Sequence, residues 1–210
     1  MIHVKRYSSC EVELNGRKLT VEGPVTPEAL AALRFDEGLK AFRIPELQHQ
    51  ALVEIAALPE GRIIIARDGE LVLAYVTFLF PDPLERWSQA KLDNLLELGA
   101  IEVSPQVRGG GISKAMLRLA FSDDAMEDYI VLTTEYYWHW DFAGTGLDIW
   151  GYRKVMEKVM GSVGMVWMAT DDPEICSHPA NCLMVRVGKR VPPEDVETFD
   201  RIRFQNRFFY

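Results

Sequence analysis

Seven stretches of the chain have the alternating or continuously apolar pattern of β-strands. They cover residues 10–14, 18–21, 62–67, 70–80, 95–103, 129–134 and 163–170. Asn15-Gly16 and Asp68-Gly69 join two neighbouring pairs of these stretches, and both dipeptides favour tight hairpin turns. We therefore expect two antiparallel hairpins before the apolar stretch at 95–103.

Between these strands, apolar residues recur at helical spacing. The helices expected from this pattern cover residues 27–33, 45–58, 111–121, 147–160 and 179–187. Thr26 as N-cap followed by Pro27 marks the start of the first helix, and Pro45 marks the start of the second. This order of hairpins, strands and helices predicts an α/β (α+β) fold. An aromatic tail occupies residues 204–210.

The junction between the strand at 95–103 and the following helix contains three consecutive glycines, Gly109 to Gly111. The first turn of a helix has N–H groups without intrahelical partners, and its dipole favours negative charge. Glycines let a ligand approach those N–H groups closely. The junction therefore predicts a cradle for a pyrophosphate, with a plain glycine-rich turn as the simpler interpretation.

The spacing of these glycines separates several kinds of phosphate loop. Consecutive glycines do not fit the G-x-G-x-x-G dinucleotide fingerprint, and Lys114 is too far from Gly111 for a P-loop. Residues 108–113, here called the cradle, resemble the R/Q-x-x-G-x-G/A signature of the GNAT N-acetyltransferase superfamily. Ser113 departs mildly from the usual last residue, and Val103-x-Pro105 is similar to the strand end of that superfamily.

That resemblance implies a central mixed β-sheet flanked by helices on both faces, and acetyl-CoA as the donor. It implies contacts with coenzyme A from Ile101, Val103, Gln106, Arg108, Gly109, Gly110, Gly111, Ile112, Ser113, Lys114 and Asn181. Asn181 begins a stretch that is similar to the asparagine end of an N-x-x-A-x-x-x-Y motif, although no tyrosine follows it. The oxyanion donor is expected near Val103, where members of the superfamily have a bulge.

Acetyl transfer to an amine needs a base, because an amine near its ordinary pKa is protonated at neutral pH. In the superfamily that the cradle resembles, the base is often a strand glutamate a little upstream of the cradle, which makes Glu97 the first candidate and Glu102 the second. A solvated or salt-bridged strand carboxylate is the alternative interpretation for each. The two are five residues apart, so they face opposite sides of a regular strand. For the general acid, Tyr152, Tyr136 and Tyr137 are not ranked by the sequence, and Tyr152 is taken forward as the expected catalytic tyrosine.

Two further segments carry chemistry-bearing side chains. Residues 133–141 are unusually aromatic and include His139, which predicts either an acceptor-binding wall or a packed core segment. Residues 171–174 form an acidic patch that suits a lysine-bearing partner or is simply a solvated turn.

Composition narrows the function classes. A formal net charge of −8 argues against a nucleic-acid binder, and it suits either a cationic substrate or solubility alone. Three cysteines and no visible signal peptide predict a cytoplasmic setting. Cys176, His178 and Cys182 lack the four-ligand spacing of a structural zinc site, so no metal is expected. No apolar run is long enough to cross a membrane.

A closer resemblance covers nearly the whole chain. The sequence is similar to the acetoin utilization acetyltransferases of Gram-positive bacteria, and five long strings carry the resemblance: residues 58–67, 81–88, 133–141, 152–158 and 177–186. It implies a cytoplasmic enzyme that acetylates and inactivates acetyl-CoA synthetase in acetoin and acetate metabolism. It implies no membrane or nucleic-acid partner, and a homo-oligomer is left open.

We expect residues 1–22 to form a hairpin extension, 23–190 the acetyltransferase domain and 191–210 a C-terminal tail. Two other functions stay open. One is an acetyltransferase for small amines, and the other is a non-catalytic protein that senses acetyl-CoA and regulates a partner by contact.

Overall fold

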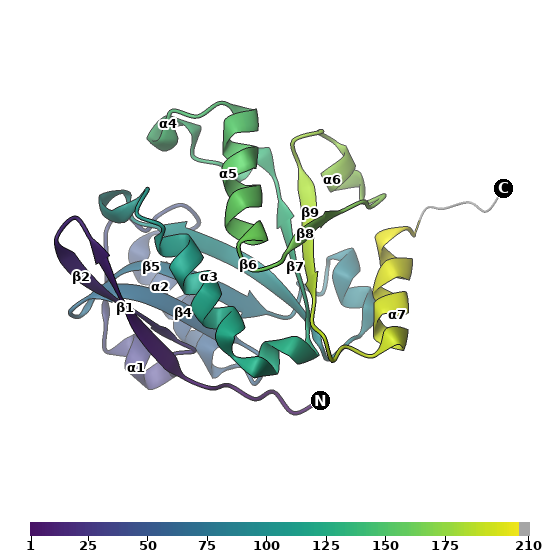
Figure 1. Ribbon diagram of the computed structural model, residues 1–210, viewed down its shortest axis with the longest axis horizontal. Helices are drawn as coiled ribbons and strands as arrows, with labels where there is room; N and C mark the ends of the chain where they lie inside the picture. Colours follow the sequence, from purple (N-terminus) through teal and green to yellow (C-terminus); the bar gives the residue numbers. More distant parts are fainter. Residues whose placement is uncertain (206–210) are drawn as a thin grey trace. The chain divides into compact units, whose positions relative to one another are not determined.

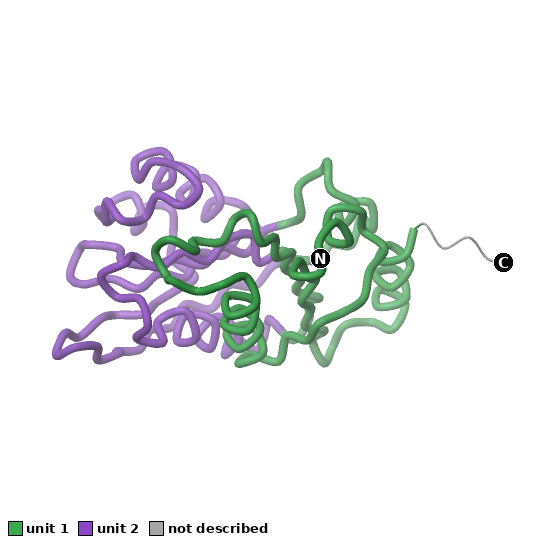
Figure 2. The backbone as a smooth tube through the Cα atoms, turned by 90° about the horizontal axis from the view of Figure 1, so that it is seen from above, with its two compact units in different colours: residues 1, 80–97, 127–210 green, residues 2–79, 98–126 purple. Residues whose placement is uncertain are grey.

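The computed structural model describes residues 1–205. The chain divides into two compact units, coloured differently in Figure 2. Unit 1 contains residue 1 and residues 80–97 and 127–210, whereas unit 2 contains residues 2–79 and 98–126. Most of the aromatic tail expected at 204–210 lies outside the described residues.

The strands of unit 2 are mostly antiparallel. They are β1 (Ser8–Leu14), β2 (Arg17–Gly23), β3 (Arg34–Phe35), β4 (Arg62–Asp68), β5 (Leu71–Leu79) and the later residues of β6 (Leu95–Val103). The order is β1-β2-β4-β5-β6, and β3 pairs with β5 in parallel. Both expected hairpins are confirmed. Asn15 and Gly16 have φ values of 52° and 76°, as a type I′ turn requires.

Three α-helices cover the strands of unit 2. Figure 1 shows α3 (Ile112–Ser122) in front of the strands, and α1 (Pro27–Ala31) and α2 (Pro45–Ala57) behind them. The Thr26 side chain accepts a hydrogen bond from the Ala29 N–H at 3.2 Å, which confirms the expected N-cap of α1. Leu30 of α1, Leu52 of α2 and Ile63 of β4 are fully buried in one apolar core. The expected helices in this part of the chain are therefore confirmed.

Unit 1 holds the remaining strands. Residues 95–97 of β6 pair in parallel with β7 (Ile130–Glu135), which pairs antiparallel with β9 (Cys182–Val187). The edge strand is β8 (Val166–Met168). The main helices are α5 (Ile149–Gly161) and α7 (Pro193–Arg203). Its shorter helical segments are Arg86–Ala90, Tyr137–His139, α4 (Phe142–Thr145) and α6 (Pro173–Cys176). Two more short segments are Pro105–Val107, in unit 2, and Asp124–Asp128, where the chain passes from unit 2 to unit 1.

One expected helix is wrong. Residues 179–187 do not form a helix, because Cys182–Val187 form strand β9 instead. Residues 182–185 are all buried, and both neighbouring strands pair with β9. A short apolar run that is buried on both faces has no strict alternation, so its pattern does not distinguish a strand from a buried helix.

The segment expected as a C-terminal tail contains helix α7. Phe199 and Ile202 of this helix pack in the apolar core of unit 1, together with Trp87, Ile130 and Leu183. The division at residues 22 and 190 stays a prediction. No helix among residues 1–205 is long and apolar enough to cross a membrane.

Candidate active site

The cradle is an open glycine loop at the start of α3. Gly109 and Gly111 have φ values of +79° and +75°, and Gly111 is the N-cap of the helix. A Cβ at either position would meet no atom of residues 1–205 within 4 Å. A Cβ at Gly110 would instead collide with the side chain of Leu14. The loop is therefore packed through Gly110, and the space beside Gly109 and Gly111 stays open.

This arrangement fits a pyrophosphate. The first N–H groups of α3 have no intrahelical partners, and their dipole favours an anion at the N-terminus. Bulkier residues at Gly109 and Gly111 would occupy the open space and would be strained at positive φ. Ile112 is buried, whereas Ser113 and Lys114 of the first turn are half-buried. The residues of the cradle thus suit the diphosphate of coenzyme A.

The buried carboxylate of Asp36 binds residues in the segment between β6 and the cradle. Asp36 accepts hydrogen bonds from the Ser104 hydroxyl at 2.7 Å, the Gln106 side-chain amide at 2.6 Å and the Gly38 N–H at 3.0 Å. Gln106 was expected to contact the cofactor, and here its amide is held by Asp36. Asp36 does not stand out in the sequence, because one aspartate two residues before a glycine is an ordinary turn signal.

Two hydrogen bonds to or from backbone groups fix the end of β6. The Arg108 side chain donates from Nε to the Val103 carbonyl at 3.1 Å, and the Ser104 N–H donates to the Leu73 carbonyl at 2.8 Å. Ile101 and Val103 are half-buried on the same strand. The coenzyme contacts expected for Ile101, Val103 and Arg108 stay predictions, as does the oxyanion donor.

Glu102, the second candidate base, is only 5 % exposed, and both of its carboxylate oxygens accept hydrogen bonds within unit 2. Oε1 accepts from the Ala41 N–H at 2.7 Å, and Oε2 accepts from the Tyr75 hydroxyl at 2.5 Å. Burial raises the pKa of Tyr75, so its phenol keeps the proton that it donates. These contacts make Glu102 an anchor between β6 and the loop around Ala41.

Glu97, the first candidate base, lies in a different environment. The parallel register pairs Glu97 with Leu132 on β7, and residue 134 lies on the same face as residue 132. Burial is the largest cause that raises the pKa of Glu97, and the charges of Glu85 and Asp82 add to it, whereas a hydrogen bond with Thr134 lowers it; together they bring the pKa to about 8. A carboxyl group with a pKa in this range is a candidate general base.

Tyr136 shares its neighbours with Glu97. It forms a side-chain hydrogen bond with Thr134, the residue that also bonds Glu97. Burial raises the pKa of Tyr136, and the charges of Asp172, Glu174 and Glu85 add to this rise. The structure therefore brings Glu97, Thr134 and Tyr136 together beside a group of carboxylates.

The other two candidate tyrosines lie in separate aromatic contacts. Tyr152 of α5 stacks on Trp140, with ring centroids 5.0 Å apart, and Tyr137 lies against His178, with centroids 4.3 Å apart. Tyr136 itself stacks on Trp138, which is 48 % exposed. The aromatic segment is therefore partly packed and partly exposed. The catalytic role of Tyr152 stays a prediction.

Asn181 is buried, and its side chain is engaged within unit 1. Its Oδ1 accepts from the Tyr137 N–H at 3.0 Å, and its Nδ2 donates to the Glu174 carbonyl at 3.0 Å. These bonds join the aromatic segment to the acidic turn before β9. The coenzyme contact expected for Asn181 stays a prediction. In the described part of the chain, no group of three or more His, Cys, Asp or Glu side chains could hold a metal ion.

Comparisons with known proteins place the chain in a family. No family model matches the sequence. The acetoin utilization proteins AcuA of Bacillus subtilis and Bacillus licheniformis are 57% and 56% identical over 210 residues, which is 100% of this chain and of each relative. The crystal structure of an acetoin utilization protein from Exiguobacterium sibiricum has a TM-score of 0.95 at 55% identity, covering 98% of this chain and 97% of that one.

Two more distant structures share only the fold. The GNAT domain of PAT from S. lividans has a TM-score of 0.52 at 13% identity, covering 85% of this chain and 96% of that one. A GNAT-family acetyltransferase from Streptococcus pneumoniae has a TM-score of 0.53 at 10% identity, covering 81% and 99%. The chain therefore belongs to the family of acetoin utilization protein AcuA and has the GNAT fold.

Proposed function

We propose that this chain is an acetyl-CoA-dependent protein lysine N-acetyltransferase of acetoin and acetate metabolism, with acetyl-CoA synthetase as its acceptor. The observation that carries the proposal is Glu97, a half-buried carboxyl group with a pKa of about 8 on the strand that leads to the cradle. Membership of the AcuA family supports the link to acetoin utilization. The acceptor protein comes from the resemblance of the long sequence strings.

The residues have complementary tasks in this reaction. Acetyl-CoA supplies an acetyl group as a thioester. Gly109, Gly111 and the first turn of α3 bind its diphosphate. Glu97 takes the proton from the lysine ammonium, either directly or through a water. A carboxylate with a pKa of about 8 is a better proton acceptor than an ordinary one, since its conjugate acid is weaker.

The neighbouring carboxylates favour a cationic acceptor. The charges of Asp82 and Glu85 act on Glu97, and Glu85 Oε2 is buried without a hydrogen-bond partner among the described residues. A lysine ammonium has three donors and a positive charge, so it matches this group of acceptors. The same ammonium lowers the pKa of Glu97 when it binds, which favours the ionised base.

Thr134 and Tyr136 complete the proposed site. Thr134 positions Glu97 through their hydrogen bond, and Tyr136 keeps its proton because its pKa is raised. Because it shares Thr134 with Glu97, Tyr136 is the tyrosine that we propose to protonate the leaving thiolate, and Tyr152 stays the alternative.

Measuring the release of free coenzyme A with different acceptors tests this function. The expected result is rapid release with purified acetyl-CoA synthetase, slow release with polyamines or free lysine, and little release without an acceptor. Equal rates with small amines would favour a small-amine acetyltransferase. Binding of acetyl-CoA with no transfer to any acceptor would favour the sensor function.

A further inference from the structure

The aromatic segment places an exposed ring beside the proposed site. The indole of Trp138 is exposed to solvent and stacks on the Tyr136 ring, with centroids 4.8 Å apart and planes inclined by 15°. Tyr136 in turn bonds Thr134, the residue that also bonds Glu97. All four residues belong to unit 1. A continuous set of contacts therefore joins the candidate base to the exposed indole.

The neighbours of Trp138 hold its ring in place. The ring of Tyr137 meets the indole edge-on at 5.4 Å between centroids, and the ring of His139 does so at 5.9 Å. The backbone is fixed on both sides, because the Tyr137 N–H donates to Asn181 Oδ1 and the His139 N–H donates to the Tyr136 carbonyl, each at 3.0 Å. A ring held in this way is a preformed surface, which lowers the entropy cost of binding.

Negative charge lies close to this ring. The charges of Asp172, Glu174 and Glu85 all act on Tyr136, on which the indole stacks. Asn181 joins the acidic turn to the aromatic segment, since its side chain bonds backbone groups of both. Glu174 is exposed, so a bound group can reach its carboxylate.

Part of this negative charge is not balanced within the chain. Among residues 1–205, Glu85 and Glu174 form no ion pair. The arginines that contact the acidic turn and the Asn181 backbone are bonded to other carboxylates, in the pairs Arg86–Asp171, Arg86–Asp172 and Arg153–Glu157. The surface beside Tyr136 therefore attracts a cation.

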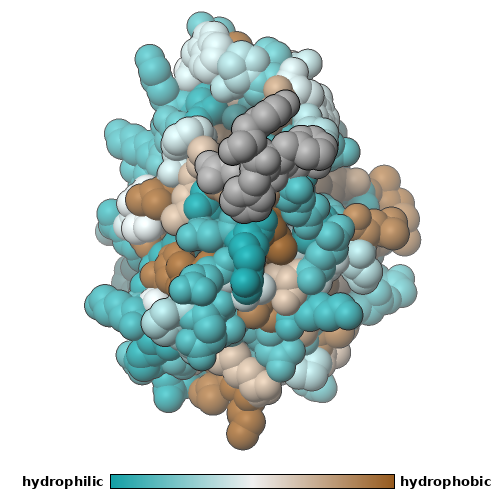
Figure 3. Space-filling view, turned by 90° about the vertical axis from the view of Figure 1, so that its right-hand side faces the viewer, coloured by the Kyte–Doolittle hydropathy of each residue, from teal (hydrophilic) through white to brown (hydrophobic). Residues whose placement is uncertain are grey.

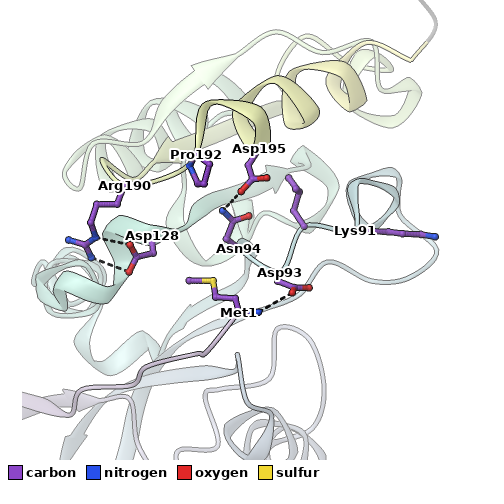
Figure 4. Close-up of a pocket in the computed structure, with 9 residues that line it drawn as sticks. Met1, Lys91, Asp93, Asn94, Asp128, Arg190, Pro192 and Asp195 are labelled. Atoms are coloured by element: carbon purple, nitrogen blue, oxygen red, sulfur yellow. Dashed lines mark hydrogen bonds and ion pairs between the residues drawn. The ribbon is translucent and has the colours of Figure 1, made fainter.

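The polar cavity at the start of β6 differs in this respect. Figure 4 shows its lining, in which the Met1 ammonium lies 3.1 Å from the Asp93 carboxylate. The Arg190 guanidinium lies 2.6 Å from the Asp128 carboxylate in the same lining. Charges that are paired in this way do not select a charged ligand, so the unbalanced carboxylates near Trp138 are the stronger attraction.

We propose that Trp138 determines the specificity for the acceptor by binding a second cation next to the acceptor lysine, the guanidinium of an arginine. This inference rests on the proposed function and deepens it. A guanidinium is planar, so it can stack on the exposed part of the indole while it donates to a carboxylate such as that of Glu174. Free lysine has no such group, which agrees with the slow reaction expected for it.

Two sets of short peptides test the proposal. Each peptide has one lysine and one arginine, and the arginine occupies a different position in each, from four residues before the lysine to four residues after it. The matched set has citrulline, which keeps the shape of arginine without its charge. Coenzyme A release is measured with the full chain and acetyl-CoA. At one or more positions, kcat/KM should be about tenfold higher with arginine than with citrulline, mainly through KM.

Three variants assign this preference to the ring. Trp138→Ala should reduce the ratio of the two kcat/KM values to about one, and Trp138→Phe, which keeps a smaller ring, should retain part of it. Trp167→Ala removes another exposed indole of unit 1, on β8, and should keep the full ratio. Because the two peptides are compared within each variant, a loss of rate that is common to both does not change the ratio.

The inference is overturned by equal kcat/KM values for the two peptide sets in the wild type. It is also overturned if Trp138→Ala retains the preference or if Trp167→Ala loses it. A lack of transfer to every peptide overturns it as well. Acetyl-CoA synthetase is assayed alongside as the acceptor, so the two proposals fail separately: labelled synthetase keeps the proposed function, whereas unlabelled synthetase rejects that function too.

Discussion

Two glutamates on one strand show how much a residue's role depends on its neighbours. Glu102 accepts hydrogen bonds from a backbone N–H and a phenol, and it anchors a loop. Glu97 lies beside Thr134 and other carboxylates, which together with burial set its pKa at about 8. Both are glutamates on the strand before the cradle, so only the contacts separate an anchor from a candidate base.

The pH dependence of catalysis tests the role of Glu97. Because its raised pKa keeps the carboxyl group protonated below about pH 8, kcat/KM should rise with pH and show an inflection near 8. Glu97→Gln should lower kcat roughly 100-fold or more and remove this inflection. Steady-state rates across the pH range provide the measurement.

A variant of a neighbouring residue tests whether the inflection comes from Glu97. The Glu85 charge raises the pKa of Glu97, so Glu85→Gln should move the inflection to lower pH. An inflection that stays in place in Glu85→Gln and persists in Glu97→Gln would show that another group controls the rate.

A buried carboxyl group at the end of β7 gives a prediction about stability. Burial raises the pKa of Glu135 to about 7, and Trp140 Nε1 donates to it at 3.1 Å. Since the folded pKa is above the unfolded one, the contribution of Glu135 to stability is highest at low pH and falls as pH rises toward 7. Glu135→Gln keeps an acceptor for Trp140 and should remove about 2 kcal/mol of this loss between about pH 5.5 and pH 8.5.

Urea unfolding of the wild type and Glu135→Gln at both pH values measures this difference. The variant should lose less stability on going to high pH than the wild type. Equal losses would mean that Glu135 does not carry a raised pKa in the folded protein.

Among the elements, the cradle is the part of the structure that the sequence predicts best. Three glycines between an apolar strand and a helix have few structural meanings, and Gly109 and Gly111 indeed have positive φ values. The strand at 95–103 and the helix after it are both confirmed. In contrast, β9 was mistaken for a helix, and α7 was not foreseen. Both depend on tertiary packing: β9 lies between two strands, and α7 buries Phe199 and Ile202.

The glycines of the cradle can be tested against a glycine of equal strain elsewhere. Gly111→Ala introduces a Cβ at a φ of +75°, in the space proposed for the diphosphate. It should weaken binding of coenzyme A about tenfold or more, since backbone strain and lost space act together. Isothermal titration calorimetry measures the affinity.

Gly69→Ala is the matched control for this experiment. Gly69 has a φ of +57° in the hairpin turn between β4 and β5, and a Cβ there also meets no described atom within 4 Å. It should lower the melting temperature about as much as Gly111→Ala and leave the affinity unchanged. Similar affinities for Gly111→Ala and the wild type would exclude the cradle as the diphosphate site.

For the whole molecule, the long strings outside the cradle carried most of the information about the family. The relatives at 57% and 56% identity confirm that resemblance over the entire chain. The cradle alone points to the donor and is silent about the acceptor. The groupings of Glu97 with Thr134 and Tyr136, and of Asp36 with Ser104 and Gln106, needed the structure because their members are far apart in sequence.

The net charge of the whole molecule argues against binding of nucleic acid, and this stays a prediction. The net charge is −8, and the side of the molecule in Figure 3 is mostly hydrophilic, with hydrophobic residues in small scattered groups. A basic face, which nucleic-acid binding needs, is not expected from such a composition. The acidic balance suits a lysine-bearing acceptor.

Mass spectrometry of acetyl-CoA synthetase tests the central claim most directly. The synthetase is incubated with isotope-labelled acetyl-CoA and either the wild-type chain or Glu97→Gln, and its labelled acetyl-lysines are counted. The account predicts a labelled lysine and loss of synthetase activity with the wild type, and neither with Glu97→Gln. A synthetase that stays unlabelled with the wild type, or is labelled equally with Glu97→Gln, would contradict it.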